Sequence, residues 1–306
     1  MVLKVGTATF SSPFGHSDLE RFLVSINCDI TNLGQAQDIK SNDKPCLYVT
    51  EGEWATLDER NHLQIVGSDE ATTCYILVLV NSKNGMVSLA HLNGWKTQEM
   101  IESMLNSFGL VEKLDLYIIG GFIDEKDVSQ PNALDILSTL CATSIEINVK
   151  GCCIYSTNTV LKNNVTFPKY YGLAYDFPTN SVYPANFFDK GINSALRSCR
   201  MFSSHNTEIA GERCCFDKTT NQLILHPIKY EVPDFLPLAL QLSDSQIRHY
   251  FSTSPKQERE GFAHHIKNCF QFLRDNPVWQ NVFPNEQPIR YKLVKNENFT
   301  TWEKVD

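Results

Sequence analysis

A cysteine and a histidine in the first third of the chain have side chains that could carry out chemistry together. Cys74 follows the polar stretch 67–73 (GSDEATT) and opens an apolar run, and His91 follows in the next predicted strand. A thiol is a weak nucleophile until it loses its proton, and an imidazole can take that proton near neutral pH. Such a pair could attack an amide carbon if the fold brings the two side chains together.

The register of the predicted hairpin 74–91 decides whether the two side chains meet. If Asn84 and Gly85 form a two-residue turn, His91 lies about 13 Å along the strand from Cys74, at roughly 3.3 Å per residue. If the loop instead ends at Asn84 and Gly85 begins the return strand, Cys74 faces His91 directly. We favour the second register because it pairs apolar side chains across the strands. A core thiol beside a half-buried strand histidine is the alternative that the pattern also allows.

Hydrophobic periodicity predicts the elements that must position this hairpin. The predicted helices span residues 17–24, 97–108, 132–141, 193–201, 234–251 and 258–275. The predicted strands span residues 47–50, 63–66, 74–80, 87–91, 114–119, 145–155, 171–175, 182–183, 213–216, 223–225, 289–295 and 301–305. Helices interspersed with hairpins favour an α+β layered fold with a largely antiparallel sheet system. We expect one domain over residues 1–306, and a polar stretch at 157–168 is the weakest point for a boundary.

Composition excludes several classes of protein. The 306 residues carry a formal net charge of −8, without a basic stripe, so neither nucleic acid nor an anionic membrane is an expected partner. No apolar run approaches the roughly 18 residues that span a bilayer, and the N-terminus lacks the apolar core of a secretory signal. None of the ten cysteines forms a Cys-x-x-Cys pair, so no metal is expected. These features predict a cytoplasmic protein, with the nucleus as a second compartment.

The segment that contains the cysteine resembles the active-site segment of the protein N-terminal asparagine amidohydrolase family. The resemblance rests on Gly67-Ser68-Asp69-Glu70-Ala71-Thr72-Thr73-Cys74 with His91 seventeen residues later. Supporting matches, in family order, are Leu47-Tyr48-Val49, Gly120-Gly121-Phe122-Ile123-Asp124, Tyr171-Gly172-Leu173-Ala174, Ser252-Thr253-Ser254-Pro255 and Trp302-Glu303-Lys304. The match begins near residue 45 and continues to the C-terminus.

The resemblance implies a cofactor-free cysteine hydrolase with an α-β-β layered sandwich, distantly related to bacterial glutamine-deamidating enzymes. Those enzymes add a hydroxyl residue shortly before the cysteine, which here falls on Ser68. Thr72 and Thr73 lie nearer to Cys74 in the sequence, so they are alternatives for the third member of the site. The implied reaction converts an N-terminal Asn to Asp with release of ammonia, through a Cys74 thioester with His91 as general acid–base. The implied role is the first step of an N-degron degradation route.

Selectivity for a chain terminus requires a group that recognises the free α-ammonium, and a buried carboxylate is the natural partner. The candidates are Asp69, Glu53 and Asp124. Thr73 is a further candidate for substrate binding, and Phe122 is a candidate wall of the pocket. Each of these residues also has an ordinary structural explanation as a surface acid, a loop hydroxyl or a core aromatic.

The expected partners are proteins or peptides with an N-terminal Asn, and we expect the enzyme to be a monomer. A glutamine deamidase or a cysteine peptidase with the same Cys–His dyad is the alternative within the enzymes. A non-catalytic peptide-binding protein on the same fold is the alternative outside them.

Overall fold

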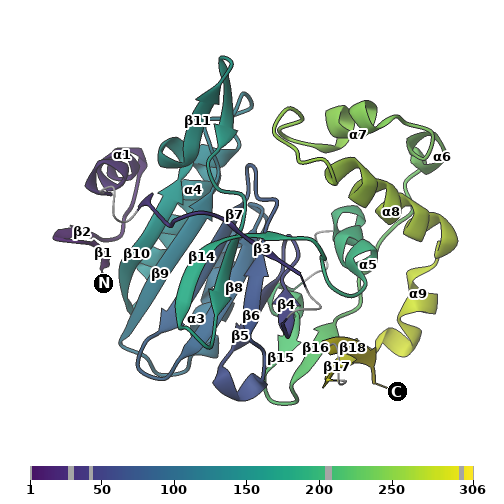
Figure 1. The fold of residues 1–306 in the computed structure, drawn as a ribbon, viewed down its shortest axis with the longest axis horizontal. Helices are drawn as coiled ribbons and strands as arrows, with labels where there is room; N and C mark the ends of the chain where they lie inside the picture. The colour runs from purple at the N-terminus through teal and green to yellow at the C-terminus, as the bar shows by residue number, and fades with distance from the viewer. Residues whose placement is uncertain (1, 27–30, 41–43, 204–208, 296–299, 306) are drawn as a thin grey trace.

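Two larger sheets form the centre of the computed structural model, which describes residues 2–26, 31–40, 44–203, 209–295 and 300–305 (Figure 1). The seven-stranded sheet has the order β2 (Ala8–Phe10), β1 (Leu3–Val5), β10 (Glu146–Ile154), β9 (Lys113–Gly120), β7 (Tyr75–Asn81), β8 (Met86–Leu92) and β5 (Trp54–Leu57). The five-stranded sheet has the order β3 (Gln37–Ile39), β14 (Ser181–Phe187), β13 (Leu173–Asp176), β6 (Ile65–Ser68) and β4 (Cys46–Tyr48).

Smaller sheets and helices surround this centre. The small sheets are β11 (Thr159–Lys162) with β12 (Val165–Pro168), and β15 (Phe216–Asp217), β16 (Gln222–Leu225), β17 (Ile289–Lys295) and β18 (Thr300–Lys304). The α-helices are α1 (His16–Ser25), α3 (Thr97–Ser107), α4 (Ser129–Ala142), α5 (Ser194–Ser198), α6 (Leu236–Ala239), α7 (Asp244–Phe251), α8 (Phe262–Asp275) and α9 (Trp279–Val282). Short 3₁₀ turns span Glu59–Asn61, Tyr155–Asn158, Cys199–Phe202, Ala210–Arg213 and Pro284–Glu286.

The central strand β7 is buried on both faces, as its uninterrupted apolar sequence predicts. Tyr75 and alternate residues after it pack with α1, α3 and α4 in one core cluster. Ile76 and alternate residues after it pack in a second cluster with strands β6 and β13 of the five-stranded sheet. The layers are therefore helices, the seven-stranded sheet and the five-stranded sheet, and helices α5–α9 form a group to one side (Figure 1).

Most strand pairs are antiparallel, as the sequence predicts. Among the described strands, parallel pairing is limited to β1–β10, β9–β10, β3–β14 and β4–β6. No helix among the described residues combines the length and the apolar character that a membrane-spanning segment needs. The predicted helix 234–251 is two helices, α6 and α7, because Ser243 begins a new helix by accepting a hydrogen bond from Gln246 N–H.

Both predicted hairpin registers are wrong, and the observed register lies between them. Asn81 pairs with Met86, and Ile76 therefore faces His91. Four residues, 82–85, form the loop, and Gly85 N–H donates to Asn81 O at 2.9 Å. Gly85 adopts a positive φ of 68°, as the favoured register predicted, but it ends the loop instead of beginning the return strand.

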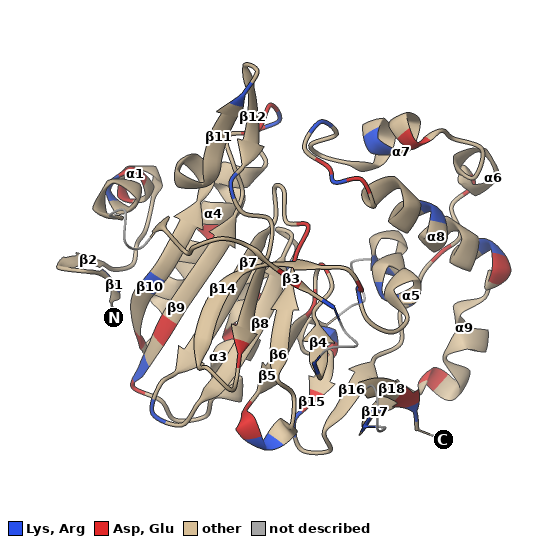
Figure 2. Cartoon of the chain, in the orientation of Figure 1, with Lys and Arg blue, Asp and Glu red and all other residues tan. Residues whose placement is uncertain are grey.

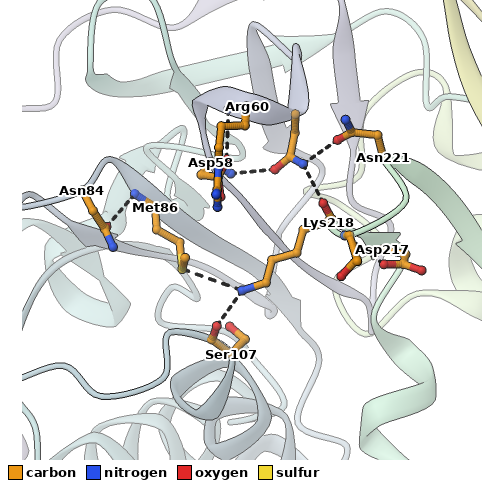
Figure 3. A network of polar contacts seen from close by, with 10 residues as sticks. Asp58, Arg60, Asn84, Met86, Ser107, Asp217, Lys218 and Asn221 are labelled. Atoms are coloured by element: carbon orange, nitrogen blue, oxygen red, sulfur yellow. Dashed lines mark hydrogen bonds and ion pairs between the residues drawn. The ribbon is translucent and has the colours of Figure 1, made fainter.

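A polar network anchors the loop end of the hairpin to neighbouring segments (Figure 3). Asn84 Oδ1 accepts a hydrogen bond from Met86 N–H at 3.1 Å, which stabilises the observed loop. Lys218 Nζ approaches Met86 Sδ at 4.0 Å and donates to Ser107 O at 2.8 Å. The first residue of β8 thus contacts the turn between β15 and β16, an interaction between distant segments that hairpin rules alone do not predict.

Candidate active site

The observed register brings the thiol and the imidazole to one face of the seven-stranded sheet. Cys74 directly precedes β7, and His91 lies opposite Ile76, so the two residues are diagonal neighbours. Cys74 Sγ, a ring nitrogen of His91 and a carboxylate oxygen of Glu51 all lie within 4.8 Å of one another. Diagonal side chains in a sheet are within reach when they are long or aromatic. The direct pairing that we favoured is therefore not needed for the contact.

Ser68 supplies the third group from the other large sheet. It is the last residue of β6, it is fully buried, and its Oγ lies 2.8 Å from His91 Nδ1. Thr73 Oγ1 instead contacts Thr253 Oγ1 at 2.8 Å. Thr72 is buried in the wall of the same pocket. The hydroxyl that contacts the imidazole therefore belongs to Ser68, and the three-residue arrangement spans both sheets.

None of the described residues forms a hydrogen bond with the second ring nitrogen of His91. His91 is 3% exposed, and its Nε2 is buried without a hydrogen bond while the residue lines the pocket that contains Cys74. A base at Nε2 requires the proton to be on Nδ1, which then donates to Ser68 Oγ. The geometry thus suits an imidazole that Ser68 orients and that accepts a proton from Cys74.

Burial keeps both members of the pair uncharged in the absence of a ligand. Burial, with a smaller contribution from Lys190, lowers the pKa of His91 to about 3. Burial, followed by the charges of Glu51 and Glu258, raises the pKa of Cys74 well above its usual value. The resting pair is therefore a neutral thiol and a neutral imidazole, so proton transfer must accompany nucleophilic attack.

Two glycines fit closely against the backbone of the cysteine. Gly120 has a φ of 127°, and a Cβ added there would lie 2.2 Å from Cys74 O. Gly121 N–H donates to the same carbonyl oxygen at 2.9 Å. Any side chain at Gly120 would displace Cys74, because the contact is with backbone and not with a flexible side chain.

The pocket around the pair lies where loops of the two sheets meet the C-terminal helices. Its lining includes three of the predicted site residues besides His91: Cys74, Thr73 and Asp69. The other lining residues come from the segment just before Cys74 and from segments far from it in the sequence. They are Tyr48, Thr50, Glu51, Glu70, Thr72, Asn93, Val128, Lys190, Ser194, Ser198, Arg200, Met201, Arg213, Phe251, Ser252, Thr253, Glu258, Phe262, His265 and Ile266. Ser68 lies behind His91 and does not line the pocket.

Asp69 is fully engaged by protein groups. Its carboxylate accepts hydrogen bonds from the Tyr48 hydroxyl at 3.0 Å and from Phe187 N–H at 2.8 Å. It also forms an ion pair with Lys190, and Arg259 lies 3.6 Å away. A carboxylate with this many partners positions the loop before Cys74 and has little capacity left for a substrate ammonium group.

The other three predicted substrate-binding residues do not line the pocket. Glu53 is fully buried in an ion pair with Arg197. Asp124 accepts amide hydrogen bonds from Val128 and Ser129 at the start of α4, and these bonds lower its pKa although burial opposes the shift. Phe122 is 1% exposed and belongs to the core. No contact with the pocket supports a substrate-binding role for these three residues, and that role stays a prediction.

The sequence did not predict three of the carboxylates that line the pocket, namely Glu51, Glu70 and Glu258. Glu51 lies in the acidic turn before β5, where Glu53 was chosen instead because both residues have the same local context. Glu258 follows the Ser252–Pro255 motif, whose first two residues also line the pocket. The sequence feature that could have indicated Glu258 is its position three residues after that motif. No other feature indicates it, because the pocket forms between segments far apart in the sequence.

Cysteine, histidine and carboxylate groups could also ligate a transition metal. Glu51, Cys74 and His91 form the one such group found among the described residues. A metal there would occupy both the nucleophile and its base, so the same geometry cannot serve metal binding and Cys74 attack at once. The nine cysteines of the described segments are all free thiols, and Cys28 lies outside these segments.

Comparison with known proteins identifies the family of this chain. The sequence profile described as "Protein N-terminal asparagine amidohydrolase" matches residues 36–304. The chain belongs to this family. The mouse protein of that name (Mus musculus) is 32% identical over 267 residues, which cover 85% of this chain and 84% of the mouse protein.

Other members of the amidohydrolase family are similar over the same extent. The human protein (Homo sapiens) is 30% identical over 267 residues, covering 85% of this chain and 84% of that protein. The Arabidopsis thaliana protein is 26% identical and covers 79% and 77%, respectively. Both carry the name "Protein N-terminal asparagine amidohydrolase". The match begins at residue 36 and includes Ser68, Cys74 and His91, so the candidate site lies inside the family region.

Proposed function

We propose that this protein hydrolyses the side-chain amide of an N-terminal Asn in proteins or peptides, giving Asp and ammonia, with Cys74 as the nucleophile. Membership of the amidohydrolase family supports the reaction class. The observation that carries the proposal is the proximity of the buried Ser68 and His91 to the partly buried Cys74, inside the region shared with that family.

The first half of the reaction forms a thioester. Cys74 Sγ attacks the amide carbon while His91 Nε2 takes the thiol proton, and the carbonyl π electrons move to the oxygen. His91 returns that proton to the amide nitrogen as the C–N bond breaks, so ammonia leaves and a thioester remains. General acid–base help of this kind contributes about 10²–10⁴-fold. The developing oxyanion needs donors, and the backbone N–H of Cys74 is a candidate.

The second half hydrolyses the thioester. A water molecule enters the position that ammonia has left, and His91 Nε2 takes one of its protons as the oxygen attacks the carbonyl carbon. The C–S bond then breaks, the thiolate recovers the proton from His91, and Asp is released. Ser68 Oγ accepts from Nδ1–H throughout, which holds the imidazole in one tautomer and stabilises the imidazolium that forms twice in the cycle.

The proposal also covers the domain organisation, cofactor, location, oligomeric state and biological role that we expect from the sequence. It assigns residues 1–306 to one cofactor-free domain of the α-β-β cysteine-hydrolase type, acting as a cytoplasmic and nuclear monomer at the first step of an N-degron route. Its support is family membership together with the layers of helices and two sheets.

A set of three peptides tests the activity. Ammonia release is measured from Asn-Leu, Gln-Leu and acetyl-Asn-Leu, and we expect turnover of Asn-Leu alone. Equal release from all three would favour a general deamidase and contradict selectivity for terminal Asn. Tight binding of Asn-Leu without any release of ammonia would favour the peptide-binding alternative.

A further inference from the structure

Four carboxylates line the pocket, and two of them already have a cationic partner. Asp69 and Glu70 both pair with Lys190, and the Glu70 distance is 3.3 Å. The remaining two, Glu51 and Glu258, have no lysine, arginine or histidine nitrogen within 4.0 Å among the described residues. Figure 2 shows acidic segments on loops between the sheets and on the chain that leads into α8. Among the described residues, neither Glu51 nor Glu258 therefore has an ion-pair partner at the pocket, although the charge of Arg248 acts on Glu258 from farther away.

Glu258 is the more enclosed of the two. It is partly buried and accepts a hydrogen bond from the Ser252 hydroxyl, whereas Glu51 is exposed and accepts one from Asn93 at 3.0 Å. Burial raises the pKa of Glu258 to about 7; the Ser252 bond opposes this shift, and the charges of Glu70 and Glu51 add to it. A carboxylate in such surroundings gains more from an arriving cation than a solvated one does.

The pocket cations are engaged elsewhere. Arg213 donates to Gly52 O at 3.1 Å and stacks over the Trp95 ring at 3.7 Å. Arg200 lies 3.8 Å from the buried carboxylate of Glu53. Neither forms an ion pair with Glu258, and Arg248 acts on it only from beyond ion-pair distance, so a ligand cation could take the position beside this carboxylate.

The unpartnered His91 Nε2 points to where that ligand reacts. It is buried and lines the same pocket as Glu258 and the Cys74 thiol. In an N-terminal Asn the ammonium nitrogen is three bonds from the side-chain amide carbon, a separation of about 3–4 Å. An ammonium group must therefore lie in this pocket whenever Cys74 attacks the amide of a terminal Asn.

We propose that Glu258 binds the free α-ammonium group of the substrate and thereby restricts the reaction to chain termini. This inference rests on the proposed function, since it assigns a substrate group to the same site. An acetylated or internal Asn would place a neutral amide beside Glu258 and leave that carboxylate unpaired. The ammonium would also offset the negative charge of Glu258, which opposes formation of the Cys74 thiolate. A free terminus would therefore both bind to the pocket and promote ionisation of Cys74.

The test compares two substrates that differ only in the ammonium group. Asn-Leu is measured beside succinamoyl-Leu, which keeps the side-chain amide and replaces the α-amino group with hydrogen. We expect wild-type protein to prefer Asn-Leu strongly in kcat/KM. Glu258→Gln should lower kcat/KM for Asn-Leu by roughly 30-fold or more, the usual effect of removing one partner of an enclosed charge pair. Its kcat/KM for succinamoyl-Leu should stay within about threefold of wild type.

A matched control and a conservative variant accompany this measurement. Glu260→Gln removes an equal charge two residues away, on an exposed side chain outside the pocket, and should leave both substrates unchanged. Glu258→Asp keeps the charge and should retain part of the preference for Asn-Leu, which tests the inference even if the Gln variant folds poorly.

Three outcomes separate this inference from the proposed function. If Glu258→Gln folds and keeps the full wild-type preference for Asn-Leu, Glu258 does not bind the ammonium, although the deamidase proposal stands. If Glu258→Gln lowers activity equally on both substrates, its role is structural and the inference fails. If wild-type protein releases no ammonia from Asn-Leu at all, the proposed function fails first.

Discussion

Removing the Ser68 hydroxyl tests the least obvious member of the site. Ser68→Ala deletes one oxygen atom from a fully buried position at the end of β6. It leaves His91 Nδ1 without its 2.8 Å partner in a region closed to solvent. The imidazole then loses the contact that selects its tautomer and its orientation toward Cys74.

The expected size of the effect follows from the lost hydrogen bond. Leaving one buried donor or acceptor unsatisfied costs about 1–3 kcal/mol. If that cost applies mainly in the transition state, where His91 is positively charged, kcat/KM falls by roughly 5- to 150-fold. The loss should appear in kcat more than in KM, because Ser68 does not line the pocket.

Ser88→Ala provides the matched control. Ser88 is also fully buried, lies on the same strand as His91, and accepts a hydrogen bond from Thr56 at 2.9 Å on the opposite face. Both variants should lose comparable thermal stability, but only Ser68→Ala should lose kcat. Equal kcat values for Ser68→Ala and wild type would refute the assignment, and so would an equal loss of kcat in Ser88→Ala.

Two further predictions concern the backbone behind Cys74 and the charge of Glu258. Gly120→Ala should lower kcat by about 10²-fold, because a Cβ at 2.2 Å from Cys74 O displaces the proposed nucleophile. The assay is ammonia release, and an unchanged kcat would show that the close fit is not needed. The pKa of Glu258 is about 7 in the folded protein against an ordinary 4.5, so the folded state binds more protons and this group lowers stability as pH rises from 4.5 through 7. Glu258→Gln should therefore melt at a higher temperature than wild type at pH 8 and near the wild-type temperature at pH 5; a difference that is the same at both pH values would contradict the raised pKa.

The elements with a clear period were predictable from sequence, and the hairpin register was not. The apolar run of β7 and the helical spacing of apolar residues in α3 follow from the burial of these elements, so hydrophobic periodicity in the sequence predicts both. The loop after β7 depends on Asn81 and Asn84 bonds to backbone N–H groups and on contacts with Lys218. The observed register lies between the two registers that the sequence allowed, because single hydrogen bonds in the loop decide which register forms.

The proximity of Cys74 and His91 was predictable because their sequence context is local, whereas the acids that line the pocket were not. Glu53 and Glu51 are two residues apart in one acidic turn, but one is buried against Arg197 and the other lines the pocket. Asp69 lies beside Ser68 in the motif, but Lys190 neutralises it from a segment far along the chain. Such pairings depend on tertiary contacts, which a single sequence does not reveal.

The role of Cys74 is the central claim, and its replacement tests that claim most directly. Ammonia release from Asn-Leu is compared between wild type and Cys74→Ala, with matched melting temperatures to show that both are folded. The account predicts that kcat falls by about 10³-fold or more, since no other group described at the pocket can form the thioester. Ammonia release by folded Cys74→Ala at the wild-type rate would contradict it.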